Sequence, residues 1–581
     1  MKLFSSLSQS RAHRISKCTS SSFYSCTGLV KRNDLSSITS NNNHQLLNNN
    51  YAQFHNNFVI GESIKERRRK EYEQHTSKKY LHTSGDESVL KGYKPVIGLE
   101  IHAQIISNSK LFSSGSTQFT NSMPNVNVTL FDASFPGTLP ILNEFCIRQA
   151  VKTGLAIGGK VNLYSQFDRK HYFYPDLPLG YQITQQFYPL ISEGKVRIDI
   201  PQGDGTYQAK YIRIARIQVE QDSGKSVHDV DYTLIDLNRA GNPLMEIITY
   251  PDISSSLEAE LFVKKLQFLL RYIGTCDGNM EEGSLRCDVN VSVYNASANE
   301  HPLSGTRCEV KNISSANNIP RAIDFEIKRH IDLLTSGQKV EQQTRTFDAK
   351  KGETILLRSK ENIPDYKFFP DPDLPYVELT EEYVQDVAKS ITSLPDQVIE
   401  RLTSEPYNLT FYDANVLLTT EGGVEFFEGI LNDKRWRSEK MNPKLVANWI
   451  ASELMGLLNT AGLSLKESPV SFIQIGSIVD AIQCEDISGK MAKKIIKIMF
   501  DEKSGEMAND IAEKHGWKQI TDRDTISSWC VQVIEQYPKE VESIKKGKDN
   551  SFPFLVAQVM KLSKGNASPT LVNQILREKM Q

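Results

Sequence analysis

The sequence lacks the local motifs that identify several common enzyme classes. Its 581 residues contain no G-x-S-x-G turn, no G-x-G-x-x-G loop and no H-E-x-x-H helix. The usual esterase, dinucleotide-binding and zinc-protease interpretations therefore have no support. Gly154 to Lys160 has the spacing of a Walker phosphate loop, but Val161 stands where Ser or Thr must hold Mg²⁺. We predict a glycine-rich helix terminus there, so any ATP site must be of another kind.

The chain also has few cysteines, no long apolar run and a small net charge. The eight cysteines include no C-x-x-C pair, which excludes a disulfide-dense secreted scaffold and the common structural zinc motifs. No stretch approaches the roughly 18 uninterrupted apolar residues of a spanning helix, so we expect no membrane span. The formal net charge is −2. Contact with RNA must therefore depend on a local basic surface, because bulk attraction is excluded.

The N-terminal segment has no acidic residue before position 34 and is rich in Ser, Lys and Arg. This composition predicts a mitochondrial transit peptide, and hence a matrix location, with a plain disordered tail as the alternative. The asparagine-rich residues 41–50 and the charged residues 65–73 are typical of a linker. We therefore assign residues 1–90 to transit peptide and linker.

The rest of the chain changes character once. Short alternating runs bounded by Gly, Pro or Asn predict strands from Pro95 to about Asp373, with helices at 142–157 and after Pro251. Beyond Leu379 the pattern is helical. We predict an α+β protein with three domains: a sheet-rich domain at 91–385, a helical domain at 386–505 and a small helical tail at 506–581.

Charged side chains at alternate positions of the predicted strands indicate a functional site. A period of two places Glu100, His102 and Gln104 on one strand face. The runs 216–222, 286–292 and 307–311 place further polar residues together: Gln218, Glu220, Arg286, Asp288, Asn290, Ser292, Arg307, Glu309 and Lys311. In one sheet these faces would form a carboxylate wall suited to Mg²⁺ and phosphoryl transfer. The alternative is a set of ordinary amphipathic strands. Cys287 and Cys308 fall on the opposite face, where we expect core packing.

The C-terminal 41 residues supply a local basic region. Val541 to Gln581 contains seven Lys or Arg and three Asp or Glu, a net charge of +4. Such a surface can meet tRNA phosphates, and a solvated helical face explains it equally well.

Long unusual strings occur in order along the chain: VIGLEIHAQ at Val96, FPGTLP at Phe135, FDRKHYFYPDLPLGYQITQ at Phe167, EQDSGKS at Glu220, LIDLNRAGNPLMEI at Leu234, EEGSLRCDVNVSV at Glu281, EVKN at Glu309, FFPDPDLP at Phe368 and FLVAQVMK at Phe554. On these strings the chain resembles the GatB family, the B subunits of heterotrimeric glutamyl-tRNA(Gln) amidotransferases, from Val96 to Lys579. The resemblance implies an α+β cradle domain with a mostly antiparallel sheet, a helical domain, and a tail that contacts tRNA.

The implied activity has two steps. ATP, with Mg²⁺, phosphorylates the side-chain carboxylate of tRNA-bound glutamate, and ammonia then displaces the phosphate to give Gln-tRNA(Gln). The implied partners are a glutaminase (amidase) subunit, which releases ammonia from glutamine into a channel, and a small third subunit. Two alternatives stay open: a subunit that only positions Glu-tRNA(Gln), and an enzyme that also accepts aspartyl-tRNA(Asn).

The resemblance also implies residue roles. For catalysis or metal ligation it implies Glu100, His102, Glu220, Asp288 and Glu309, with Glu246, Glu281 and Glu282 as second choices. For the channel or substrate pocket it implies Asp168, Arg169, Lys170, Tyr172, Tyr174 and Tyr181. For phosphate or the terminal adenosine it implies Lys225, Asn238, Arg239, Arg286 and Lys311. One position departs from the family: many bacterial members have a second acidic residue after Glu220, where this chain has Gln221.

Overall fold

The computed structural model describes residues 90–119, 122–204, 206–359, 366–520, 522–545, 552–563 and 565–580. The predicted transit peptide and linker therefore lie outside the described residues, as do four charged residues of the tail: Lys546, Lys548, Asp549 and Lys564.

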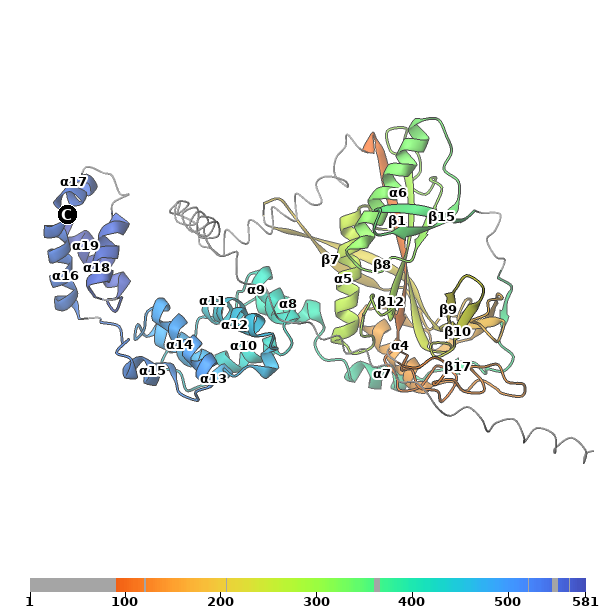
Figure 1. The fold of residues 1–581 in the computed structure, drawn as a ribbon, viewed down its shortest axis with the longest axis horizontal. Helices are drawn as coiled ribbons and strands as arrows, with labels where there is room; N and C mark the ends of the chain where they lie inside the picture. Colours follow the sequence, from red (N-terminus) through yellow and green to blue (C-terminus); the bar gives the residue numbers. More distant parts are fainter. Residues whose placement is uncertain are drawn as a thin grey trace, which may run out of the picture. The chain divides into compact units, whose positions relative to one another are not determined.

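A ten-stranded sheet forms the centre of the first part of the described chain (Figure 1). Its strands follow the order β15-β14-β13-β12-β1-β11-β8-β6-β2, and β7 also pairs with β8. Their bounds are β1 Tyr93–Gln104, β2 Lys160–Val161, β6 Ile191–Ser192, β7 Lys195–Pro201, β8 Tyr207–Gln221, β11 Pro243–Thr249, β12 Leu285–Asn295, β13 Cys308–Lys311, β14 Gln343–Asp348 and β15 Glu353–Ser359. The β13–β14 pair is parallel and the other pairs are antiparallel. The predicted α+β class with a mostly antiparallel sheet is confirmed.

Three small sheets accompany the large one. β16 (Phe368–Pro370), β4 (Asp168–His171) and β5 (Tyr181–Thr184) form a three-stranded sheet. β9 (Lys225–His228) pairs with β10 (Thr233–Asp236), and β17 (Val377–Glu378) pairs with β3 (Tyr164–Ser165). The first and third of these sheets join segments about 200 residues apart in the sequence, which pattern reading alone does not reveal.

Alternation along β1 separates a dry face from a polar one. Leu99, Ile101 and Ala103 are buried, as the period of two requires. Helices α5 (Ser256–Tyr272) and α6 (Asn318–Thr335) contact the sheet and each other, and both run beside it in Figure 1. The core therefore lies between these helices and the apolar strand faces, and the opposite strand faces are left to polar side chains.

The start of helix α5 and the end of helix α4 are each fixed by local features of the sequence. The Ser255 hydroxyl accepts the N–H of Glu258, the third residue of α5, while the Glu258 carboxylate accepts the N–H of Ser254. Helix α4 (Glu144–Ala156) ends near Gly158, whose φ is +65°, so the predicted helix terminus is confirmed. Gly154 itself lies within the helix. A glycine is required there because a Cβ would stand 2.4 Å from the Ile191 side chain.

The remainder of the described chain is helical. The first group of helices is α7 Glu381–Lys389, α8 Pro395–Thr403, α9 Phe411–Thr419, α10 Gly423–Asn432, α11 Pro443–Asn448, α12 Met455–Ala461, α13 Phe472–Gln483, α14 Gly489–Glu502 and α15 Ala508–Lys514. The second is α16 Arg523–Gln536, α17 Pro538–Lys545, α18 Phe552–Leu562 and α19 Pro569–Met580. Most of α8–α15 shares one hydrophobic cluster, and the last helices share another. No helix in the described parts of the chain is both long and apolar enough to cross a membrane.

A buried ionic network ties α6 to the edge of the large sheet. The Glu326 carboxylate is fully buried, accepts from Arg329 at 2.7 Å and lies 3.1 Å from Arg345 of β14. Burial opposes its charge, but the bonds from His330, Arg329 and Thr354 prevail and hold the pKa of Glu326 at about 2. The network therefore stabilises the fold while this carboxylate is ionised.

Replacing Glu326 by Gln leaves Arg329 and Arg345, which are both largely buried, without the carboxylate that neutralises them. We expect a loss of roughly 3–5 kcal/mol in the stability of the sheet domain, measured by thermal unfolding and by amide exchange in α6. Because the folded pKa lies below the unfolded one, the difference is full above about pH 5 and fades as the pH falls towards 2. Glu353→Gln on β15, at an exposed ion pair, is the matched control and should change little. Equal losses in the two variants would contradict the role of the network.

Candidate functional site

Strand register gathers the predicted acidic residues on the polar face of β1. Glu100 lies opposite Asp288 of β12, and His102 lies opposite Glu246 of β11 on its other side. Glu220 of β8 also reaches this group, since its Oε1 lies 3.5 Å from Nε2 of His102. The predicted wall therefore exists: four strands bring carboxylates and one imidazole together.

Two overlapping sets of ligand atoms share His102. The sets are His102 with Glu220 and Glu246, and His102 with Glu100 and Asp288. In each, one potential ligand atom per residue lies within 4.8 Å of the others. Hard cations such as Mg²⁺ and Mn²⁺ prefer oxygen ligands, whereas softer metals prefer thiolates. A set of carboxylates with one imidazole therefore favours Mg²⁺ or Mn²⁺.

Burial and neighbouring charge set the protonation of this group. Burial lowers the pKa of His102 well below its usual value, and the charges of Arg286, Lys311 and Lys170 lower it further. Its imidazole is therefore neutral, the form that ligates metals. Burial, and then the carboxylate of Glu246, raises the pKa of Glu100 to about 8. The carboxylates thus repel one another without a cation.

Glu220 gives the sharpest test of whether a cation fits. Its side chain is 1% exposed, and no residue in the described parts of the chain hydrogen-bonds its Oε2. Burial is the main reason that the pKa of Glu220 is raised, and the charge of Lys170 offsets this in part. A buried carboxylate oxygen without a partner is costly. The donor set around His102 therefore fits a divalent cation, which would satisfy this oxygen.

Lys311 and Glu309 extend the wall along β13. The Lys311 ammonium contacts Asp288 and lies 2.9 Å from the Glu309 carboxylate. Glu309 also accepts a hydrogen bond of 3.0 Å from Thr344, and its side chain is about a quarter exposed. Asp288 and Lys311 therefore connect Glu309 to the cation site.

The predicted phosphate-binding residues fall into two groups. Arg286 pairs with Asp222 at 3.0 Å beside His102, so it adjoins the wall, as does Lys311. Arg239 donates to the Ser223 and Gly224 carbonyls, and Asn238 is fully buried and bonded to the backbone at Met123 and Asn127. Lys225 lies on the β9–β10 hairpin and lines a separate cavity of about 460 Å³. Arg239 also lies 3.4 Å from Asp222, the partner of Arg286. The predicted role of Asn238 and Arg239 in binding phosphate or the terminal adenosine stays a prediction.

The predicted channel block occupies β4, β5 and the loop between them. Asp168 is fully buried and accepts the N–H of Phe187, and Arg169 pairs with Asp371 and Asp373. Arg169 also lies over the ring of Tyr181. The ammonium of Lys170 lies near the rings of Tyr172 and Tyr366, and Tyr172 contacts Tyr174. Burial opposes the charge of Lys170, but the Glu220 and Glu246 carboxylates raise its pKa.

Sequence reasoning missed or underrated several residues here. Glu246 was a second choice, yet it faces His102 directly and accepts from Gln218. Its position in the string LIDLNRAGNPLMEI was the available signal. Tyr366 and Phe368 received no role, although Lys170 lies 4.9 Å from the Tyr366 ring centroid and pairs with Phe368 in register.

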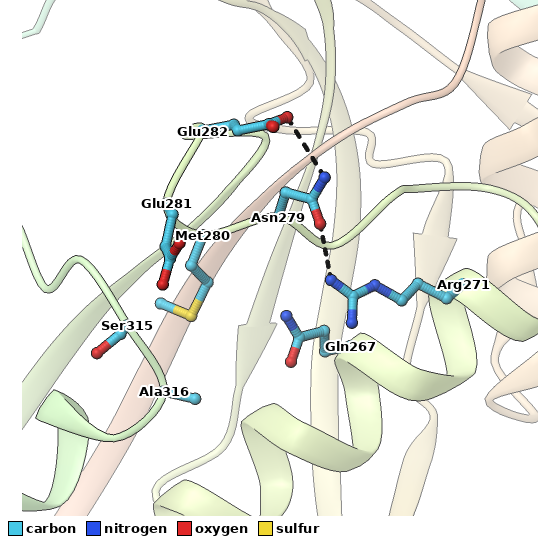
Figure 2. A pocket seen from close by; sticks show the side chains of 8 residues that line it. All are labelled: Gln267, Arg271, Asn279, Met280, Glu281, Glu282, Ser315 and Ala316. Atoms are coloured by element: carbon cyan, nitrogen blue, oxygen red, sulfur yellow. Dashed lines mark hydrogen bonds between the residues drawn. The ribbon is translucent and has the colours of Figure 1, made fainter. Parts of the chain in front are cut away.

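Glu281 and Glu282 belong to a different place. They line a cavity of about 350 Å³ with Gln267 and Arg271 of α5. Figure 2 shows these side chains around it. Asn279 bridges Arg271 and Glu282 there. The geometric groups that contain His102 do not include these two glutamates.

A third cluster of metal-ligand types lies on the opposite face of β13. Cys308, Glu326 and His330 are fully buried there, as predicted for Cys308. The Glu326 oxygens already accept from Arg329 and Thr354, and Arg329 also lies 3.4 Å from the Cys308 sulfur. Two guanidinium groups beside the cluster disfavour a further cation, so we regard it as structural.

Comparisons with known proteins confirm the family that the sequence strings resemble. Residues 95–385 match the GatB/GatE catalytic domain, and residues 426–580 match the GatB domain. The B subunit of the mitochondrial glutamyl-tRNA(Gln) amidotransferase of Naegleria gruberi is 84% identical over 87% of this chain and 98% of that protein.

Bacterial relatives extend the likeness. The B subunits of the aspartyl/glutamyl-tRNA(Asn/Gln) amidotransferases of Rickettsia conorii and Rickettsia bellii are each 49% identical over 84% of this chain and 97% of their own length. The Naegleria relative confirms the predicted mitochondrial location. With the matched domains and these identities, the chain belongs to the GatB family.

Proposed function

We propose that this chain is the kinase and amidotransferase subunit of a tRNA-dependent amidotransferase. It activates the glutamate of Glu-tRNA(Gln) with ATP as a γ-glutamyl phosphate and amidates it with ammonia, giving Gln-tRNA(Gln) for mitochondrial translation. The observation that carries the proposal is the buried convergence of His102, Glu220 and Glu246, with an unpartnered Glu220 oxygen among the described residues. The Naegleria and Rickettsia relatives, named as B subunits, support the substrate and the need for partner subunits.

The residues divide the chemistry between them. His102 would hold Mg²⁺ with Glu220 and Glu246, or with Glu100 and Asp288. A cation held there would supply positive charge against the phosphate oxygens. Lys311 and Arg286 lie at the same wall, where their charges can orient phosphate oxygens. Lys170, Tyr172 and Tyr174 would border the path by which ammonia and the acceptor carboxylate arrive. Phosphorylation replaces a poor leaving group with a good one.

We assign the partners and domains on the same basis. A glutaminase (amidase) partner supplies ammonia from glutamine, and a small third subunit joins it to this chain. We propose a cradle domain at residues 91–385, a helical domain at 386–505 and a tRNA-binding tail at 506–581, behind a transit peptide and linker at 1–90. Helix α15 lies after residue 505 but packs in the hydrophobic cluster of the helical domain. The tail retains Lys561, Arg577 and Lys579 among its described residues for phosphate contacts.

A second substrate is favoured by one specific observation. The Rickettsia relatives carry names that include both aspartyl-tRNA(Asn) and glutamyl-tRNA(Gln). The test gives Asp-tRNA(Asn) and Glu-tRNA(Gln) separately to the same reconstituted complex and measures amidation of each. Amidation of both would show a double specificity, and amidation of Glu-tRNA(Gln) alone would show a single one.

The direct test reconstitutes this chain with its two partner subunits and measures ATP- and glutamine-dependent conversion of Glu-tRNA(Gln). We expect wild type to form Gln-tRNA(Gln). His102→Ala should lose most activity and bind Mn²⁺ about 10–100-fold more weakly in titrations, because the two ligand sets share this imidazole. Normal Mn²⁺ affinity and turnover in the variant would refute the site.

A subunit that only positions tRNA predicts a different outcome at Glu309. Glu309→Gln preserves shape but removes the negative charge beside Lys311. We expect transamidation to fall about 10–100-fold while tRNA affinity stays normal. Glu353→Gln on exposed β15 is the control. Unchanged turnover in Glu309→Gln would favour the positioning alternative.

Metal affinity should depend on pH through Glu100. Its raised pKa of about 8 means that the metal-free protein holds a proton there at neutral pH, which a metal must displace. Mn²⁺ affinity should therefore rise about ten-fold per pH unit up to about pH 8 and level off above it. His102 adds no slope, because its pKa is lowered and it is already neutral. Burial also raises the pKa values of Glu220 and Glu246, so Glu100→Gln should lower the slope only by the share of this one proton. An unchanged slope would exclude Glu100.

A further inference from the structure

Arg216 of β8 lies on the polar face of the large sheet because the strand is irregular beside it. Ile214 is fully buried in the core, so simple alternation would direct Arg216 there too. The register with β11 shifts at this point: Ile248 pairs with Arg216, but the next β11 residue pairs with Ile214. The extra β8 residue, Ala215, forms a β-bulge, which re-aims the side chains that follow it. Arg216 therefore shares the polar face with Glu220, four residues later.

The Arg216 guanidinium has no partner in the part of the chain that the structure describes. Its Nε is buried without a hydrogen bond, and no carboxylate there forms an ion pair with it. Burial, and then the charge of Glu220, raises the pKa of Glu246, and the charge of Arg216 is among those that oppose the rise. A guanidinium stays charged and carries five N–H donors. A half-buried one without an anion is unfavourable for stability alone.

Two other cations of the carboxylate wall already pair with carboxylates. Lys311 of β13 lies against two of them, and Arg286 of β12 pairs with Asp222 at 3.0 Å. These strands lie on one side of β1, whereas β8 lies on the other. Arg216 and Glu100 occupy the same row across the sheet, two strand spacings or about 10 Å apart. An anion held by a cation at the wall is therefore within reach of the Arg216 side chain.

We propose that Arg216 binds the phosphoryl group that is transferred to glutamate, on the side of the cation site opposite Lys311 and Arg286. This inference rests on the proposed function, in which that group carries negative charge before, during and after its transfer. The planar fork of a guanidinium matches two phosphate oxygens at once. Arg216 is the cation of this face that has such a fork without a carboxylate partner among the described residues.

The group is negatively charged in both steps of the proposed reaction. A γ-carboxylate oxygen of glutamate attacks the terminal phosphorus of ATP, the bond from this phosphorus to the bridging oxygen breaks, and ADP keeps the electron pair. Ammonia then attacks the acyl carbon. Phosphate leaves with the electron pair of the C–O bond and takes the proton that ammonia gives up. A fixed guanidinium favours both the transfer and the departure, because each places charge on the phosphate oxygens.

The test compares Arg216→Ala with Arg213→Ala in the complete three-subunit complex. Arg213 lies on the same strand, where it is exposed and pairs with Asp252, so it is the matched control. The measurements are the Kd for inorganic phosphate in the presence of Mg²⁺, the Kd for Mn²⁺, the kcat and the KM for ATP, and the unfolding temperature. Turnover of Arg216→Ala is also measured with added guanidinium ion, which can occupy the space of the missing side chain.

We expect Arg216→Ala to bind inorganic phosphate about ten-fold more weakly, the effect of one charge-assisted hydrogen bond. The kcat should fall about 100-fold with little change in the KM for ATP. Added guanidinium ion should restore part of the kcat, which a purely structural role does not predict. Mn²⁺ affinity should not fall, because Arg216 is no metal ligand, and Arg213→Ala should match wild type throughout.

Wild-type phosphate affinity and kcat in Arg216→Ala, in a complex that converts Glu-tRNA(Gln), would refute the role of Arg216 alone. If Arg216→Ala loses stability or the partner subunits, Arg216→Lys decides, because it keeps the charge without the planar fork. An unchanged phosphate Kd and kcat in Arg216→Lys would then overturn the proposal, and a reduced kcat at the wild-type unfolding temperature would support it. An inactive wild-type complex refutes the proposed function itself, and the phosphate Kd still shows whether Arg216 binds the anion.

Discussion

Repulsion among buried carboxylates is the constraint on which the polar face of this protein depends. Glu100, Glu220 and Glu246 converge on His102 because three antiparallel pairings fix their register. Burial and mutual repulsion raise the pKa values of all three glutamates. Such an arrangement is unfavourable for stability alone, and it becomes favourable when a divalent cation is bound.

The apolar side of the sheet supplies the rigidity that holds these charges in place. Leu99 and Ile101 of β1 are buried on the face covered by helices, so the strand cannot slip by one residue without exposing them and burying its charges. On β13, Cys308 is buried on that same side while Glu309 points to the wall. The ionic network around Glu326 then anchors α6 to β14.

Long-range pairing of short strands completes the surroundings of the site. β16 brings Tyr366 and Phe368 beside Lys170 and Tyr172, although the two segments are far apart in the sequence. The result is an acidic wall that suits a cation next to a group of aromatic rings.

The sequence by itself determined the α+β class, the family and the face on which Glu100, His102, Asp288 and Glu309 lie. It could do so because alternation along a strand is a local property with a period of two. It could not rank Glu246 above Glu281, and it could not place Tyr366 and Phe368 beside Lys170. Only the tertiary structure decided these points, because strand order and register are set by contacts between distant segments, which local patterns do not encode.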